Sequence, residues 1–127
     1  MAAPTTPAPN GIVLIDKPQG FTSHDAVARI RKLAGTRKVG HAGTLDPMAT
    51  GLLILGLGPS TRLLTFIVGL SKEYVATIRL GSSSTTDDAE GDLLGFAPQA
   101  QLDRVTDELI ADGIIPLTGE IEQVPST

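Results

Sequence analysis

Apolar and polar residues alternate along this chain in segments that predict a mixture of short strands and helices. The β-branched run GIVLID over residues 11–16, stopped by Lys17 and Pro18, predicts a buried strand followed by a turn. The apolar run LLILGLG over residues 52–58 predicts a second strand, buried on both faces. Residues 72–80, KEYVATIRL, alternate in character and place Tyr74 among the apolar positions of one side, which predicts a third strand.

Three segments carry helical signals. The first predicted helix begins at Ser23 as its N-cap, has Asp25 in its first turn and ends at Gly35. Its inward stripe consists of Val27, Ile30 and Ala34. A short helix is predicted to begin at residue 59 or 60. Apolar residues at positions 102, 105, 109 and 110 predict an amphipathic helix that ends near residue 113.

The length of 127 residues and an apolar fraction of 41% fit one globular unit. Residues 1–10, MAAPTTPAPN, have no cationic start and no apolar core, so they predict a flexible tail and not a signal peptide, ahead of a single domain over residues 11–127. The absence of Cys excludes disulfides and zinc-thiolate sites. Glycine, proline and arginine interrupt the apolar residues 52–70, so no membrane span is predicted and we expect a soluble, cytoplasmic protein.

The formal net charge of -4 hides an asymmetry between the two parts of the chain. Residues 1–80 contain nine Lys and Arg against four Asp and Glu, whereas residues 81–127 contain one against ten. Five basic residues fall within ten positions, and they are Arg29, Arg31, Lys32, Arg37 and Lys38. This basic stripe fits a phosphate-binding surface. A solvated helix end, favoured by the helix dipole, is an equal alternative.

The segment RKVGHAGTLDPMATG over residues 37–51 contains the most distinctive chemistry. Pro47 moves Asp46 out of the helical region, and the glycines allow close backbone approaches, so Asp46 is predicted to lie on a shaped loop. The alternative is that the Asp46 carboxylate only accepts backbone N–H bonds in an Asx-turn.

Other polar residues have functional and structural interpretations of their own. Arg62 lies in the first turn of a predicted helix, an unfavourable place for a cation, which indicates a ligand, although a solvated side chain also fits. Tyr74 also fits an ordinary half-buried strand aromatic, and His24 a surface or capping residue. The acidic segment SSSTTDDAEGD over residues 82–92 does not fit a calcium loop, because Thr86 and Ala97 would occupy the end positions that need Asp and Glu.

Four separated blocks of the chain together resemble the N-terminal part of the TruB-type tRNA pseudouridine synthases. They are GIVLIDKPQGFTSHDAV, KVGHAGTLDPMATGLLILGLGPSTR, KEYVATIRLG and TDDAEG, in that order, and they cover residues 11 to about 126. The resemblance implies an α/β fold in which a mixed, largely antiparallel sheet is flanked by helices. It also implies conversion of the T-arm uridine at position 55 of tRNA to pseudouridine, with no cofactor and no metal.

The resemblance also assigns roles to residues. Asp46 corresponds to the catalytic aspartate, Tyr74 to a tyrosine that stacks on the target base and assists proton removal, and His41 to a histidine that helps to bring the uridine out of the RNA. Asp88 corresponds to an acidic position that supports the site without contacting substrate. The residues expected to bind substrate are His41, Gly43, Thr44, Lys17, Lys38 and Arg62.

A single carboxylate suits this chemistry, because the C1′–N1 bond must break and a C1′–C5 bond must form without loss of base or sugar. Whether the carboxylate attacks C1′ or adds to the pyrimidine ring is open. Extruding the base costs a few kcal/mol. Stacking on an aromatic residue, worth about 1–3 kcal/mol, offsets much of that cost.

In the family, a basic residue that pairs with the catalytic aspartate, an RNA-gripping segment and a C-terminal RNA-binding domain lie beyond the position of Thr127. We therefore expect this chain to be a truncated piece that is monomeric, lacks some sheet strands and is inactive alone. One alternative is a non-catalytic RNA-binding module that uses the basic stripe. The other is a protein that binds a small phosphate compound in the glycine-rich loop, although the loop lacks the GxxxxGK[ST] pattern.

Overall fold

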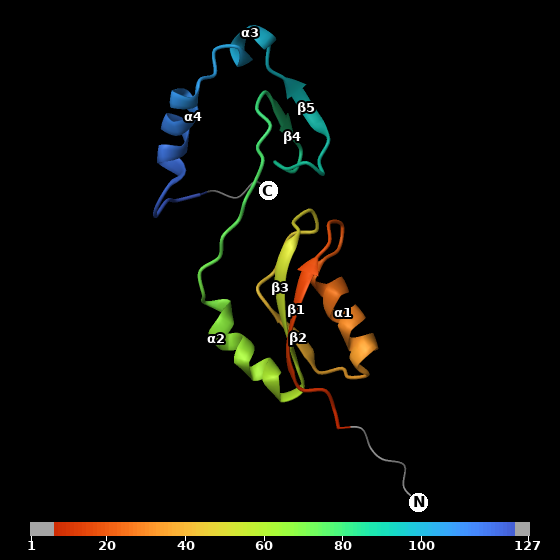
Figure 1. Ribbon diagram of the computed structural model, residues 1–127. Helices are drawn as coiled ribbons and strands as arrows, with labels where there is room; N and C mark the ends of the chain where they lie inside the picture. The colour runs from red at the N-terminus through yellow and green to blue at the C-terminus, as the bar shows by residue number, and fades with distance from the viewer. Residues whose placement is uncertain (1–6, 124–127) are drawn as a thin grey trace, which may run out of the picture. The chain divides into compact units, whose positions relative to one another are not determined.

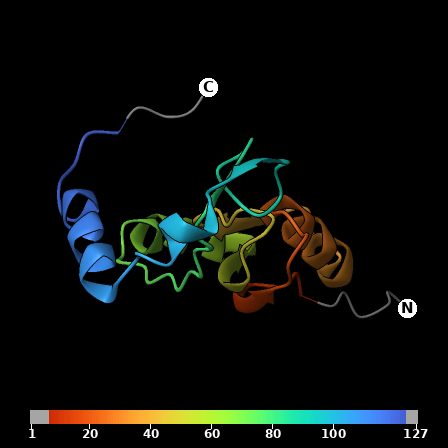
Figure 2. The ribbon, with the colours of Figure 1, turned by 90° about the horizontal axis from the view of Figure 1, so that it is seen from above.

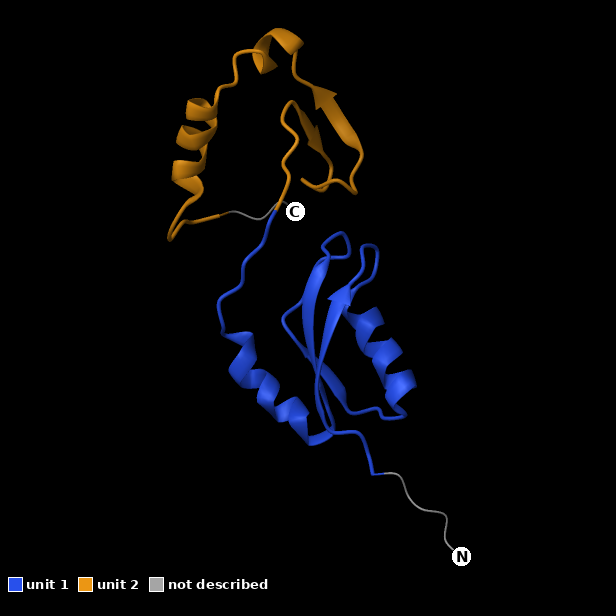
Figure 3. Cartoon of the chain, in the orientation of Figure 1, with its two compact units in different colours: residues 1–75 blue, residues 76–127 orange. Residues whose placement is uncertain are grey.

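The computed structural model describes residues 7–123 and separates into two compact units, Met1–Val75 and Ala76–Thr127 (Figure 3). Length alone had predicted one unit. The first residues of the predicted tail, 1–6, lie outside the described residues. Asn10 at its other end is attached to the first unit, because its Oδ1 accepts hydrogen bonds from the N–H and the hydroxyl of Ser60 at 3.0 and 2.8 Å.

The first unit is built on a three-stranded antiparallel sheet of order β1-β3-β2 (Figure 1). The strands are β1 (Gly11–Lys17), β2 (Val39–Ala42) and β3 (Gly51–Leu57). β2 lies inside the segment that was predicted to be a loop. The register pairs Leu55 of β3 with Val13 on one side and with His41 on the other, so these side chains share a face. Leu53 and Leu55, almost fully buried, are the centre of the core on that face.

Helix α1 (Ser23–Ala34) covers this face of the sheet. Its predicted inward stripe is confirmed, because Val27 is buried in the core while Ile30 and Ala34 pack against it. The side chain of Ala26 is also buried there.

The predicted N-cap of α1 was wrong by one residue. Thr22 is the cap: its Oγ1 accepts from the N–H of Asp25 at 3.0 Å, while the carboxylate of Asp25 accepts from the N–H of Thr22 at 2.9 Å. This reciprocal pair is a capping box. Ser23 is left to turn its hydroxyl into the interior. Gly35 ends the helix as predicted, in the left-handed conformation at φ 61° that glycine adopts without a steric penalty.

The opposite face of the sheet is covered at one end by the 3₁₀ helix η1 (Gly58–Leu63) and helix α2 (Leu64–Val68), which confirms the predicted short helix. Figures 1 and 2 show α1 and α2 on opposite sides of the sheet. Close packing here depends on the paired glycines Gly40 and Gly56, since a Cβ on Gly56 would lie 3.0 Å from the carbonyl oxygen of Ser60.

The prediction that β3 is buried on both faces is wrong for part of the strand. Leu52 is 63% exposed and Leu14 on the neighbouring strand β1 is 65% exposed. The reason is that η1 and α2 cover only the end of the sheet that carries Gly56, so the start of β3 has a cover on the α1 face alone.

The predicted strand over residues 72–80 is absent. Residues 71–79 have neither helix nor strand, and every side chain from 71 to 80 is exposed. Alternation sets which residues share a side, but a strand forms only beside a hydrogen-bonded neighbour. Within residues 7–123 no strand pairs with this segment.

The second unit contains a two-stranded antiparallel sheet of β4 (Ser82–Ser84) and β5 (Leu93–Phe96). Three short helices follow: α3 (Gln99–Leu102), α4 (Asp107–Ile114) and the 3₁₀ helix η2 (Ile115–Leu117). The single helix predicted near residues 102–110 is therefore two, because the hydroxyl of Thr106 accepts from the N–H of Leu109 and begins a new helix. The end predicted near residue 113 is confirmed, because α4 ends at Ile114.

The predicted fold class is confirmed: the chain combines helices with antiparallel strands. Among residues 7–123, no helix has both the length and the apolar character needed to cross a bilayer.

Candidate active site

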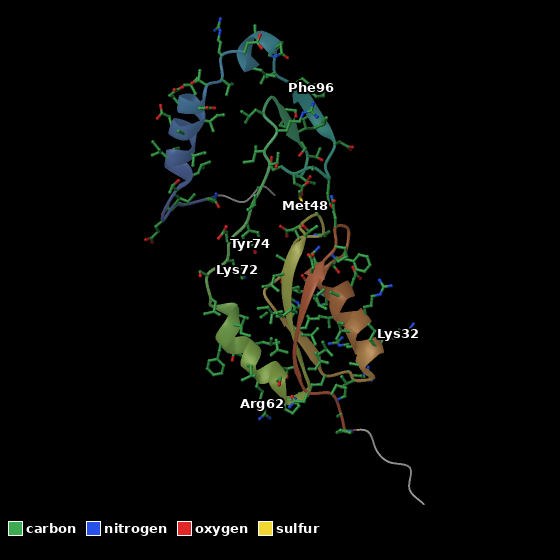
Figure 4. All side chains as sticks on the ribbon, in the orientation of Figure 1. Lys32, Met48, Arg62, Lys72, Tyr74 and Phe96 are labelled. Atoms are coloured by element: carbon green, nitrogen blue, oxygen red, sulfur yellow. The ribbon has the colours of Figure 1, made fainter. Side chains whose placement is uncertain are left out.

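Asp46 lies on the loop of residues 43–50 that joins β2 to β3, here called the Asp46 loop; Figure 4 labels Met48 on it. Asp46 is exposed, and its backbone carbonyl accepts from the N–H of Ala49 at 3.0 Å. In the described part of the chain, the bonds that shape this turn are made by backbone atoms of the loop and not by the Asp46 carboxylate. The Asx-turn alternative is therefore wrong, and the carboxylate is available for chemistry.

Lys17 holds the Asp46 loop from β1. Its side chain is fully buried, and its ammonium donates to the backbone carbonyls of Pro18, Phe21 and Pro47 at 3.1, 2.6 and 3.2 Å. Three carbonyls match the three protons of an ammonium, which is how a buried charge is accommodated. The Pro47 carbonyl, directly after Asp46, also accepts from the N–H of Gly20 at 2.8 Å. This burial favours a role for Lys17 in shaping the loop over the predicted contact with substrate.

Ser23 holds the same loop from the start of α1. Its hydroxyl accepts from the N–H of Leu45 at 3.0 Å and lies 3.3 Å from the Leu45 carbonyl, to which it donates. The side chain is only 1% exposed. This role was not predicted, because a serine at the start of a helix favours capping.

His41 holds the beginning of the loop from β2. Its Nδ1 lies 2.6 Å from the carbonyl oxygen of Gly43, and because a carbonyl only accepts, Nδ1 carries the proton. Its ring also meets the ring of His24 edge to face, with centroids 5.8 Å apart. Gly43 has a φ of +84°, which favours glycine, and the neighbouring Thr44 is exposed.

The structure places Tyr74 in the uncovered segment after α2, where it is 62% exposed and forms no hydrogen bond to Asp46. Lys72, two residues earlier, reaches the loop: its Nζ lies 2.8 Å from the position that a Cβ on Gly43 would take. Figure 4 labels both side chains on this segment. Lys72 had no sequence signal of its own.

The basic stripe is only partly free to meet a ligand. Arg31 donates from Nη2 to the carbonyl of Val39 at 3.0 Å, and the guanidinium of Arg29 lies 5.7 Å from the centre of the Phe21 ring. All five members are exposed. The two contacts of the arginines leave Lys32, Arg37 and Lys38 as the members most free to meet a polyanion.

Arg62 is not part of the Asp46 loop's surroundings. It is exposed in η1, beyond the far end of β3, and Figure 4 shows Arg62 and Met48 at opposite ends of the unit. Seven strand residues separate them, which is roughly 20 Å of sheet. Arg62 can meet only a distant part of a large ligand that also reaches Asp46.

Asp88 lies in the second unit and shapes its own turn. Its carboxylate accepts from the hydroxyl of Thr86 at 2.6 Å and from the N–H of Glu90 at 2.9 Å. These bonds, the one from Thr86 above all, hold the pKa of Asp88 below its ordinary value. Residues 7–123 contain no group of three or more His, Asp or Glu side chains placed to hold a metal ion.

The fold and the loop define a protein of the α/β class that presents one carboxylate on a glycine-rich loop held at three points. The sequence profile of the TruB family pseudouridylate synthase (N terminal domain) matches residues 31–127. The chain is 70% identical over 117 residues to the tRNA pseudouridine synthase B of Leifsonia xyli subsp. xyli (strain CTCB07), covering 92% of this chain and 39% of that protein. It is 61% identical over 118 residues to the tRNA pseudouridine synthase B of Paenarthrobacter aurescens (strain TC1), covering 93% and 37%.

The chain therefore belongs to the TruB family of pseudouridylate synthases and matches its N-terminal domain, which confirms the resemblance seen in the sequence motifs. It spans about two fifths of the length of the curated relatives that it matches.

Proposed function

We propose that this chain supplies the nucleophile-bearing part of a tRNA pseudouridine synthase that acts on the T-arm uridine at position 55. The observation that supports this most directly is the exposed Asp46 carboxylate, which takes no part in shaping its loop although Lys17, Ser23 and His41 hold that loop. The relatives named above carry the name of this activity.

The reaction is an isomerisation. The C1′–N1 bond breaks, a C1′–C5 bond forms, the proton on C5 leaves and N1 gains a proton, so atoms and electrons balance without a redox partner. Asp46 acts as the nucleophile, either at C1′ or at the pyrimidine ring, and a covalent intermediate divides one difficult step into two easier ones. Tyr74 stacks on the extruded base, which offsets part of the few kcal/mol that extrusion costs.

His41 is proposed to contact the RNA beside the target uridine. Its Nδ1 is occupied by the Gly43 carbonyl, which leaves Nε2 as the ring atom that can meet a ligand. Gly43 and Thr44 present loop backbone to the same nucleotide. Lys38 and its exposed neighbours on the basic stripe contact phosphates farther along the RNA.

A chimera tests this function directly. In it, this chain replaces the matching 39% of the Leifsonia xyli relative, and pseudouridine in tRNA is measured by carbodiimide-stop primer extension. We expect product from the chimera and none from its Asp46→Asn variant, with tRNA affinity changed by no more than a few-fold, because the substitution is isosteric. Asp112→Asn, at an exposed site on α4, is the control. Turnover retained by Asp46→Asn would remove Asp46 from the mechanism.

The exposed cations Lys32, Arg37 and Lys38 support a second candidate, an RNA-binding module without turnover. Each phosphate contact contributes about -0.7 to -0.9 to the slope of log affinity against log salt concentration. Three contacts therefore predict that log affinity falls by about 2 to 3 per tenfold rise in salt. The 127-residue chain with a T-arm stem-loop is the sample for this titration. Product formed by the chimera rules out this candidate as a full account.

A further inference from the structure

Lys72 makes a long-range contact that neither the sequence motifs nor the proposed chemistry explain. It follows α2 in a segment where all side chains are exposed, yet its end turns back to the Asp46 loop. A Cβ built on Gly43 would lie 2.8 Å from Nζ and 3.2 Å from Cε of Lys72. The end of Lys72 therefore lies over the α-carbon of Gly43, where an added Cβ would require the lysine to move.

Gly43 lies between His41 and Lys72 and contacts both. Its carbonyl accepts from Nδ1 of His41, and its α-carbon is covered by the end of Lys72. Its φ of +84° directs the chain into the loop, and Asp46 follows three residues later. A contact at Gly43 is therefore a contact to the part of the loop that carries the proposed nucleophile.

We propose that Lys72 is a positioning residue that keeps Tyr74 within reach of the Asp46 loop. Lys72 and Tyr74 are two residues apart, so their α-carbons are at most about 7 Å apart. Seating Lys72 on Gly43 therefore limits how far Tyr74 can move from Asp46. The importance of this arrangement for catalysis rests on the proposed function.

Tyr74 itself reports on this contact. The chain contains one Tyr and no Trp, so its intrinsic tyrosine fluorescence comes from Tyr74 alone. In the 127-residue chain, Lys72→Ala removes the contact, and Gly43→Ala puts a methyl group where the end of Lys72 lies. Gly119→Ala is the matched control, because Gly119 has nearly the same φ, +89°, but nothing lies within 4 Å of the added Cβ.

We expect Lys72→Ala and Gly43→Ala to lower the fluorescence anisotropy of Tyr74 and to raise its quenching by acrylamide. The rise is at most about 1.6-fold, the ratio of full exposure to the present 62%. Gly119→Ala should leave both signals unchanged, and Lys72→Arg should keep them close to those of the wild type. Unchanged signals in Lys72→Ala, or equal changes in Gly119→Ala and Gly43→Ala, would overturn the proposal. Lys72 is exposed, so its substitution leaves the fold intact.

Adding a T-arm RNA stem-loop separates this proposal from the proposed function. Stacking of the base should quench Tyr74 in the wild-type chain, and Lys72→Ala should reduce that quenching. If RNA never quenches Tyr74 but the variants alter its anisotropy as expected, the positioning stands and the stacking role proposed for Tyr74 fails. If RNA quenches Tyr74 equally in the wild type and in Lys72→Ala, the positioning fails and the function stands.

Discussion

Replacing Lys17 by Met tests how the Asp46 loop is held. Met is similar in volume and one atom shorter, and it lacks the ammonium that donates to the carbonyls of Pro18, Phe21 and Pro47. The Pro47 carbonyl keeps its bond from Gly20, so the largest loss is at Phe21, whose bond of 2.6 Å is the shortest. Hydrogen bonds to charged groups contribute about 1.5–3 kcal/mol each, and the relief of a buried charge offsets part of their sum. We expect the free energy of unfolding to fall by about 2–4 kcal/mol.

Urea denaturation followed by far-ultraviolet circular dichroism, to which α1 contributes as the longest helix among residues 7–123, measures this loss. With a slope of about 1 kcal/mol per molar urea for a small unit, the midpoint should fall by about 2 M or more. Loss of the helical signal without urea would be the same result in its extreme form. The control is Lys32→Met, an exposed lysine in the last turn of α1 (Figure 4), which should cost less than about 1 kcal/mol. Equal midpoints for the two variants would refute the argument that the buried ammonium holds the loop.

Substitutions at three further positions, Asp25, Gly35 and Tyr74, test separate features. Asp25→Asn removes the carboxylate of the capping box, whose pKa the hydroxyl of Thr22 above all holds below its ordinary value of about 3.9. The contribution of this carboxylate to stability is therefore present above that pH and is lost as the pH falls through the lower, folded pKa, so wild type and variant should converge in acid melting curves. Gly35→Ala should destabilise α1 by about 1–2 kcal/mol in urea titrations, because φ is 61°, whereas Gly69→Ala, at a φ of -85° with open space around it, should be close to neutral. In the chimera, Tyr74→Phe should retain RNA binding but slow product formation, and Tyr74→Ala should harm both; near-wild-type rates for both would contradict the stacking role.

Features that depend on neighbours in sequence could be predicted from the sequence. The inward stripe of α1 and its end at Gly35 follow from side-chain spacing and from the left-handed conformation that glycine accepts. Asp46 was placed on a loop for a similar reason, because the effect of Pro47 on the preceding residue is local.

Features that depend on tertiary contacts could not be predicted. A lysine at the end of an apolar strand gives no sign that three carbonyls will surround it, so Lys17 was predicted to contact substrate. Ser23 and Thr22 are both suitable N-cap residues, and Thr22 is the one that caps α1. The hydroxyl of Ser23 therefore bonds the backbone of the Asp46 loop. Residues 72–80 alternate in character as a strand does. A strand also needs a hydrogen-bonded neighbour, and the spacing of apolar residues does not show whether one is present.

The way the Asp46 loop is held bears on how its chemistry can be tested. Lys17 donates to the carbonyl of Pro47, Ser23 bonds the backbone of Leu45, and His41 donates to the carbonyl of Gly43. All of these partners within the loop are backbone atoms, so the loop keeps its shape whatever side chain occupies position 46. Asp46→Asn should therefore leave the stability and the Lys72 contact unchanged. A loss of turnover in that variant can then be attributed to the missing carboxylate, which is the proposed nucleophile, because the bonds that hold the loop do not involve that side chain.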